Sequence, residues 1–120
     1  MIYAFENLRV WQKSRKFVTL IYAITDKFPK TEKYGVVSQM QRASMSASNN
    51  LAEGSCRWSK KEQARFYEIA YGSLIEVLNQ MILSVDLEFI PESVLLETRP
   101  AIEELSWMIN SLRKAAWLKS

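Results

Sequence analysis

Apolar residues at alternating spacings of three and four dominate the sequence, and this helical periodicity limits what the chain can fold into. The first such segment runs from about residue 6 to residue 28. Its seam residues are Val10, Ser14, Phe17, Ile21, Ile24 and Phe28. Further segments cover residues 32–54, 59–87 and 91–118, and none shows the strict alternation of a half-buried strand. The pattern therefore predicts an all-α protein of four helices.

Residues that start and stop helices separate these segments. Pro29 ends the first, because proline disfavours helical geometry in the residue before it. Gly54 ends the second, since glycine tolerates the left-handed conformation that often follows a helix. Ser59 and Glu62 form the Ser-x-x-Glu pattern of a capping box, in which each side chain accepts a backbone N–H of the other residue. The connections between helices are therefore expected to be short.

Two prolines shape the last segment. Pro91 suits the first turn of a helix, and Pro100 is expected to kink this helix or to break it into two pieces. Small residues line the second helix, which we therefore expect to be central: Ala43, Ser44, Ser46, Ala47 and Ser48. Because short connections make neighbouring helices antiparallel, the sequence predicts an up-down-up-down four-helix bundle that forms one domain over residues 1–120.

Two of the helices carry a second apolar seam. The first seam of the third helix is Tyr67, Ala70, Leu74, Val77 and Met81. Its second seam is Tyr71, Ile75, Leu78, Ile82, Val85 and Phe89. The first helix adds a stripe of Leu8, Trp11, Val18 and Tyr22. A wide core can absorb such a seam, or the second face can pack against another subunit; we favour the latter, which predicts a homo-oligomer.

The composition excludes most catalytic chemistry. The chain has no histidine and a single cysteine, Cys56, so it lacks Ser-His-Asp and Cys-His arrangements, histidine-bound zinc and an internal disulfide. Ser111 and Lys114 have the Ser-x-x-Lys spacing of some acyl enzymes, but on a basic helix end we attribute it to chance. Three carboxylates could meet inside a bundle and bind a metal, but carboxylates alone would suit a hard cation at best. They are Glu53, Glu68 and Glu76. We therefore expect a protein that is not an enzyme and uses no metal or cofactor.

Charge is unevenly distributed along the chain. The net charge is +3 overall, with +6 in residues 1–75, −6 in residues 76–110 and +3 in residues 111–120. Such an uneven distribution of charge favours electrostatic steering of a binding partner and head-to-tail assembly. No apolar stretch approaches the ~20 residues that span a bilayer, and no secretory signal is visible. We therefore expect a cytoplasmic protein without a membrane partner.

Basic residues gather in two places. The row at helical spacing in the first helix is Arg9, Lys13 and Lys16. The cluster around the turn before the third helix is Arg57, Trp58, Lys60, Lys61 and Arg65. Basic side chains neutralise phosphates and an aromatic ring can stack on an unpaired base, so the pattern favours binding to RNA loops or single strands. The alternative interpretation is an ordinary solvated helix surface.

Short motifs in a fixed order resemble a known family. They are Phe5-Glu6-Asn7-Leu8-Arg9-Val10-Trp11, Phe28-Pro29-Lys30, Tyr34-Gly35, Arg42-Ala43, Asn49-Asn50-Leu51-Ala52-Glu53-Gly54, and Gly72-Ser73 with Glu76. Together they resemble the four-helix-bundle proteins encoded in intervening sequences of bacterial 23S ribosomal RNA genes. The resemblance covers residues 5 to about 90.

The resemblance implies a four-helix protomer, a ring of about five subunits and a link to ribosomal or intervening-sequence RNA. Several matching residues are expected to specify architecture rather than a ligand site: Arg42, Asn49, Glu53, Gly54, Gly72 and Glu76. We expect Gly72 at a close crossing of two helices. The four polar side chains of this set are expected to form a hydrogen-bonded network inside the bundle.

The leading hypothesis is a non-enzymatic, homo-oligomeric helical protein that binds RNA through the basic residues named above. The alternative is a protein-interaction scaffold, or an accessory subunit for a protein partner, without direct nucleic-acid binding. Capture of a partner that survives nuclease treatment would distinguish the second hypothesis from the first.

Overall fold

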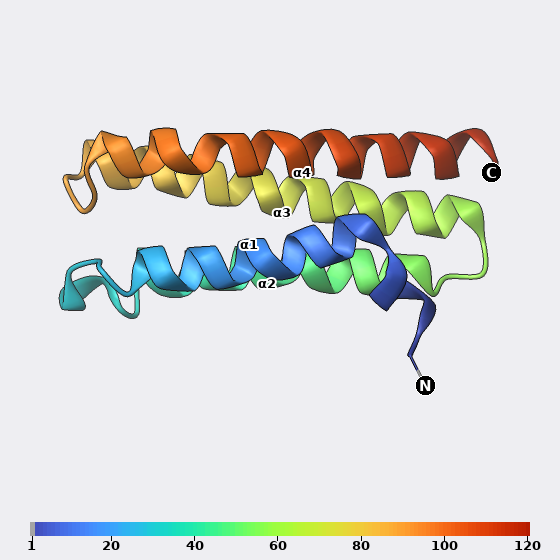
Figure 1. The fold of residues 1–120 in the computed structure, drawn as a ribbon, viewed down its shortest axis with the longest axis horizontal. Coiled ribbons are helices and arrows are strands. Elements are labelled where there is room, and N and C mark those ends of the chain that lie inside the picture. Colours follow the sequence, from blue (N-terminus) through green and yellow to red (C-terminus); the bar gives the residue numbers. More distant parts are fainter. Residues whose placement is uncertain (1) are drawn as a thin grey trace.

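The computed structural model describes residues 2–120, in which the chain forms four long helices. They are α1 (Arg9–Thr25), α2 (Val36–Ser55), α3 (Lys60–Asp86) and α4 (Glu92–Leu118). Two short 3-10 helices, η1 (Ala4–Asn7) and η2 (Lys30–Glu32), precede α1 and α2 (Figure 1). The prediction of an all-α fold with four helices is confirmed.

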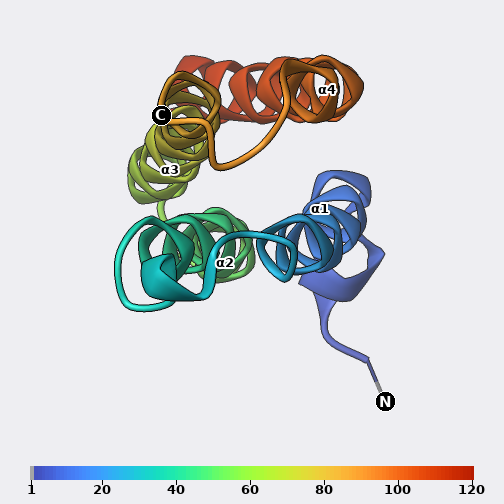
Figure 2. The ribbon, with the colours of Figure 1, turned by 90° about the vertical axis from the view of Figure 1, so that its left-hand side faces the viewer.

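Helices that follow one another in sequence pack side by side and alternate in direction (Figure 1). α1 contacts α2, α2 contacts α3 and α3 contacts α4, while α1 also contacts α4 and so closes the bundle. α1 and α3 therefore lie at diagonally opposite corners, as do α2 and α4 (Figure 2). The result is an elongated up-and-down bundle that measures 45 × 29 × 21 Å.

The core is built from the seams that the periodicity predicts. Every residue of the first predicted seam is buried except Ile24, which is partly buried and packs against the core. Phe28, the last of them, is buried although it lies beyond the end of α1. In α3 all five residues of the first seam are at most 4% exposed. Ala43, Ser44 and Ala47 of α2 are buried as well, and such small side chains allow α2 to lie close to both α1 and α3.

The wide core accommodates most of the second seam of α3. Tyr71, Leu78, Ile82 and Val85 are partly buried and pack against the core, whereas Ile75 is 38% exposed. The second seam is therefore no proof of a subunit interface. Apolar surface does remain on the outer side of α3.

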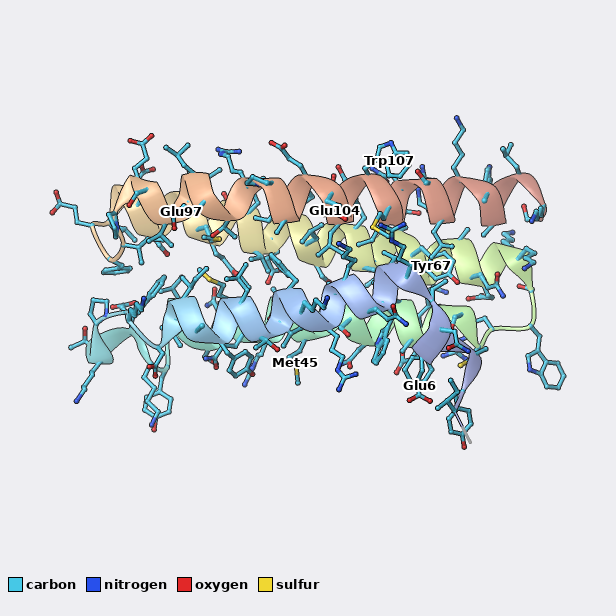
Figure 3. All side chains as sticks on the ribbon, viewed as in Figure 1. Glu6, Met45, Tyr67, Glu97, Glu104 and Trp107 are labelled. Atoms are coloured by element: carbon cyan, nitrogen blue, oxygen red, sulfur yellow. The ribbon has the colours of Figure 1, made fainter. Side chains whose placement is uncertain are left out.

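Tryptophan side chains lie mostly at the surface. Trp58 is fully exposed, Trp107 is 70% exposed and Trp117 is 54% exposed. Figure 3 shows Trp107 projecting away from α4 into the solvent. The fourth tryptophan, Trp11, is partly buried and packs edge-on against Phe5, with ring centroids 4.9 Å apart.

The ends of the first two helices differ from the predicted ones. Residues around Glu6 form η1 rather than the first turn of α1, and the Glu6 carboxylate accepts a hydrogen bond from the backbone N–H of Tyr3 at 2.6 Å. α2 begins at Val36, after Gly35, because residues 30–32 form η2 instead. The predicted helices at 6–28 and 32–54 are therefore each shorter at their start, and the first also ends earlier than predicted, at Thr25.

α4 continues through Pro100 as one helix, so the alternative of a break into two pieces is wrong. Proline lacks the N–H that would bond the carbonyl of Leu96, four residues earlier. Both residues are exposed, so water can satisfy that carbonyl and the helix loses little by continuing.

Candidate nucleic-acid interface

The predicted RNA-binding cluster lies at the end of the bundle where α2 ends and α3 begins. Ser59 caps α3, because its hydroxyl accepts a hydrogen bond from the backbone N–H of Glu62 at 3.0 Å. This part of the predicted capping box is confirmed. The Glu62 carboxylate lies 4.0 Å from the Arg65 guanidinium on the solvent side of the same turn.

Contacts to α3 hold Arg57 in place. Its guanidinium lies over the ring of Phe66, 4.3 Å from the centroid, in a cation–π arrangement. Its backbone carbonyl accepts a hydrogen bond of 2.9 Å from the side-chain amide of Gln63. The short connection between α2 and α3 is therefore anchored at Arg57 before it reaches Trp58.

Trp58 has no covering side chain at all, since its exposed fraction is 101%. Lys60, Lys61 and Arg65 beside it are also exposed. The Lys60 ammonium donates a hydrogen bond of 3.3 Å to the amide oxygen of Gln63. The structure therefore brings one free aromatic ring together with several solvated cations, which matches the chemistry that single-stranded nucleic acid needs.

One basic residue just past the end of α4, Lys119, was missed as part of this candidate site. Lys119 and Lys60 line the same shallow hollow, together with Gln63 and Tyr67. The signal was present in the sequence, because an up-and-down bundle places the end of the fourth helix beside the start of the third. The basic end of the molecule consists of Arg57, Trp58, Lys60, Lys61, Arg65 and Lys119.

The basic row on α1 is not part of one continuous surface with that cluster. Lys13 is tied to α4 by an ion pair with Glu104, with 3.1 Å between nitrogen and oxygen. Lys13 and Lys16 both line a small hollow between α1 and α4 that also contains Glu104. Arg9 is exposed at the first residue of α1. An acidic side chain thus interrupts this row.

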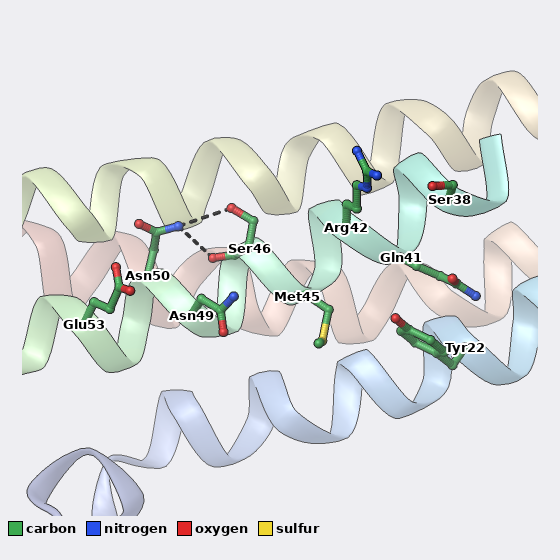
Figure 4. A pocket seen from close by; sticks show the side chains of 9 residues that line it. All are labelled: Tyr22, Ser38, Gln41, Arg42, Met45, Ser46, Asn49, Asn50 and Glu53. Atoms are coloured by element: carbon green, nitrogen blue, oxygen red, sulfur yellow. Dashed lines mark hydrogen bonds between the residues drawn. The ribbon is translucent and has the colours of Figure 1, made fainter. Parts of the chain in front are cut away.

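The polar residues of the family-like motif lie outside the bundle, so the expected internal network is wrong. Arg42, Asn49 and Glu53 are exposed and line an open groove on the solvent side of α2 (Figure 4). Glu76 is also exposed and accepts a hydrogen bond of 3.3 Å from Gln80. Within residues 2–120 no hydrogen bond or ion pair joins any two of the four. Small and apolar side chains already occupy the inner face of α2.

The two motif glycines have different environments. A Cβ on Gly54 would lie 2.8 Å from Tyr67 Cε1 and 2.9 Å from Phe66 Cβ, so Gly54 allows the close approach of α2 and α3. A Cβ on Gly72 would meet nothing within 4 Å. The close crossing expected at Gly72 is therefore found at Gly54. Gly54 is still inside α2 and has no positive φ, which corrects its expected role as a left-handed cap.

Tyr67 lies at this end of the bundle and has a shifted pKa. Burial of the phenol, and second the nearby Cys56, raise the pKa of Tyr67 above its ordinary value. Cys56 itself is an exposed free thiol. Residues 2–120 contain no group of three or more Cys, Asp or Glu side chains placed to hold a metal ion. In the same residues no helix is long and apolar enough to cross a membrane.

Fold and surface together define a four-helix bundle protein with a basic, aromatic-bearing end. A family model for the 23S rRNA-intervening sequence protein matches residues 6–111. The chain belongs to this family, as its motifs predict. Comparison with curated proteins gave no match.

Proposed function

We propose that the protein is a non-enzymatic RNA-binding protein that works as a homo-oligomer and holds RNA at its basic end. The observation that carries this proposal is the fully exposed Trp58, set beside an anchored Arg57 and the exposed lysines Lys60 and Lys61. An uncovered indole has a large apolar surface in water, which stacking on an unpaired base would cover. The family name, with its reference to 23S ribosomal RNA, supports RNA as the ligand.

Self-association is proposed from the apolar surface that the single bundle leaves uncovered. Exposed large apolar side chains occur on the outer sides of both α3 and α4, Trp107 and Leu96 among them. Soluble monomers rarely keep extended apolar surface exposed. Binding of a separate protein partner is the competing explanation for the same surface. Sedimentation velocity of the purified protein distinguishes the two, because only self-association produces a larger species in the absence of other proteins.

The RNA proposal is tested by charge reversal at the basic end. We expect Lys60→Glu with Lys61→Glu to weaken binding to a fluorescein-labelled single-stranded RNA at least tenfold. The slope of log K against log salt should also decrease by about 1.4, since each phosphate contact on a single strand contributes roughly 0.7. Fluorescence anisotropy across a salt titration measures both quantities.

The matched control places the same charge change at the other end of the molecule. Lys30 and Lys33 lie in the connection between α1 and α2 and are exposed. Lys30→Glu with Lys33→Glu should leave the RNA affinity within about twofold of wild type. Equal losses in the two double variants would show that only net charge matters, and would contradict a site at the basic end.

Trp58→Ala separates stacking from charge. A stacked base contributes about 1–3 kcal/mol, so the affinity for single-stranded RNA should fall by roughly fivefold or more with an unchanged salt slope. Binding to a fully paired DNA duplex of matched length should not change. Loss of affinity for both ligands alike would argue against stacking.

A further inference from the structure

A second hollow lies at the opposite end of the molecule from the basic end, where the connection between α1 and α2 reverses the chain (Figure 1). Its volume is about 730 Å³, which is within the range of sites that hold a ligand. This connection hollow is formed by the last residues of α1, the connection itself and the start of α2. No residue of the basic end lines it.

The apolar part of the connection hollow suits a single large side chain. Phe28 and Val37 line it and are themselves buried, so they form its floor. The rings of Tyr22 and Tyr34 line it as well and are exposed. An aromatic side chain from another molecule would cover part of each of these surfaces, and removal of apolar surface from water favours binding.

Two lysines line the same hollow. Lys30 is the first residue of η2 and Lys33 follows its last residue. Residues three apart in a 3-10 helix lie one above the other, separated by about 6 Å along the axis. The Lys33 ammonium also lies 5.4 Å from the centroid of the Tyr34 ring, in a cation–π arrangement. Within residues 2–120 neither lysine forms an ion pair, so both are available to a carboxylate from outside.

Gln41 and Ser38 offer hydrogen-bonding groups at the inner side of the hollow. The side-chain amide N–H of Gln41 donates to the Thr25 hydroxyl at 3.1 Å. This contact fixes the amide and leaves its oxygen to accept an N–H. The Ser38 hydroxyl has no hydrogen-bond partner in the described part of the chain and can donate to a carbonyl. One acceptor and one donor are what the backbone of a peptide needs.

We propose that the connection hollow binds an extended, acidic segment of a partner protein. Residues two apart in an extended chain point to the same side and lie about 6–7 Å apart. This spacing matches Lys30 and Lys33, so carboxylates at positions i and i+2 can meet both cations while an aromatic side chain at i+4 enters the hollow. The proposal concerns a site apart from the basic end and does not depend on RNA binding.

The charges at the hollow favour a protein segment over a nucleic acid. Asp26 lines the hollow and is exposed, and Glu32 lies between the two lysines in sequence. A phosphate backbone carries a charge at every nucleotide and would meet these carboxylates as well as the lysines. A peptide can place its two carboxylates on the lysines alone.

The hollow also leaves room for the rest of the segment. Tyr22, Ser38 and Gln41 line both the hollow and the open groove on the solvent side of α2 (Figure 4). A chain that leaves the hollow can therefore follow this groove toward Arg42 and Asn49. A segment of several residues thus fits better than an isolated side chain.

The probe is a fluorescein-labelled peptide, Ser-Glu-Ser-Glu-Ser-Trp-Ser, and fluorescence anisotropy measures its binding. Wild type should bind it saturably, with a Kd below about 1 mM. Exchange of both glutamates for glutamine should weaken binding roughly tenfold, and so should exchange of the tryptophan for serine. Absence of saturable binding, or equal binding of the glutamine peptide, would refute the proposal.

The cationic side is tested with Lys30→Glu and Lys33→Glu combined, which should weaken binding of the acidic peptide at least about tenfold. The matched control is Lys60→Glu with Lys61→Glu, which makes the same charge change at the basic end and should leave the peptide affinity within about twofold. Circular dichroism checks that both variants are folded. Equal losses in the two variants would show attraction by net charge alone and would refute this site.

The same two double variants distinguish a peptide from RNA in the hollow. The affinity for single-stranded RNA should fall only in the Lys60→Glu, Lys61→Glu variant. A loss of RNA affinity in the Lys30→Glu, Lys33→Glu variant alone would show that nucleic acid occupies the hollow and would overturn the proposal. Peptide binding without any RNA binding would refute the proposed RNA function and leave this site standing.

The aromatic side is tested with Ser38→Trp, which fills the hollow from α2. The variant should bind the tryptophan peptide no more tightly than wild type binds the serine peptide. The matched control is Ser38→Ala, which leaves the hollow open and should cost about fivefold or less, because one hydrogen bond is lost. A folded Ser38→Trp variant with wild-type affinity for the tryptophan peptide would show that the anchor lies elsewhere and would refute the proposal.

Discussion

Tyr67 shows how one residue links the core to the basic end. Its ring is 4% exposed and packs where α2 and α3 meet, close to Gly54, while the residue also lines the hollow that contains Lys60 and Lys119. Burial, and to a smaller extent Cys56, raise its pKa. The proton on this phenol is therefore coupled to folding.

Stability at high pH should fall in part because of Tyr67. A tyrosine in the unfolded chain ionises near pH 10, whereas folded Tyr67 keeps its proton to a higher pH. Above about pH 10 the unfolded state then binds fewer protons than the folded state, so the free energy of unfolding decreases as the pH rises. Below that pH this group does not change the free energy of unfolding with pH. Tyr67→Phe should make that decrease shallower in urea unfolding followed by circular dichroism from pH 8 to 11.

The control for this measurement is Tyr34→Phe, because Tyr34 is 88% exposed. It should leave the pH dependence of wild type intact. Parallel curves for wild type and the Tyr67→Phe variant would show that Tyr67 contributes nothing to it.

The motif residues on α2 show where sequence reasoning failed at this scale. Ala43, Ala47 and Leu51 already occupied the buried face of α2, and the helical repeat places Arg42 and Asn49 on a different side. The prediction treated the motif as one buried polar unit, although the helical repeat places its polar side chains away from the buried face. The register of the helix alone would have placed these side chains outside.

At the scale of the helices, the two motif glycines should respond in opposite directions to alanine. Gly54→Ala forces Phe66 and Tyr67 to move, and overpacking of this kind costs about 1–3 kcal/mol, against a gain of up to about 1 kcal/mol in helix propensity. Gly72→Ala has open space and should stabilise the bundle by up to about 1 kcal/mol.

Urea denaturation of wild type and of the two variants at one protein concentration, followed by circular dichroism, measures this difference. The midpoint should decrease for Gly54→Ala and increase for Gly72→Ala. A stabilising Gly54→Ala would show that the contact between α2 and α3 relaxes easily.

Helix identity was predictable and helix ends were less so. The periodicity of α1 and α3 predicts their buried seams because a helix core depends on spacing alone. The start of α2 was predicted at residue 32, four positions too early, since Glu32 ends η2 and residues 33–35 form a turn before α2 begins at Val36. Pro100 wrongly indicated a break in α4. A proline breaks a helix less readily where the carbonyl that it leaves unbonded, here that of Leu96, faces water.

At the scale of the whole molecule, the candidate RNA-binding residues illustrate what topology adds to sequence. The cluster around Trp58 was visible as a run of neighbouring residues, whereas Lys119 joins it only through the antiparallel packing of α3 and α4. The ion pair between Lys13 and Glu104 spans 91 positions of the chain, so periodicity in one helix could not reveal it.

Self-association and RNA binding at the basic end should reinforce one another. A self-associated protein should bind an RNA long enough to reach several subunits at least tenfold more tightly than an RNA of about ten nucleotides, since linked sites raise the effective concentration. Fluorescence anisotropy with both RNAs measures this, and equal affinities for the two RNAs would contradict it.

The surface position of most tryptophans has a consequence for spectroscopy. Indole emission shifts with the polarity around the ring, and Trp58, Trp107 and Trp117 already face water in the folded protein. Unfolding therefore changes the environment of Trp11 far more than that of the other three. Intrinsic fluorescence of this protein will report poorly on loss of the core, and will respond best when something covers its surface.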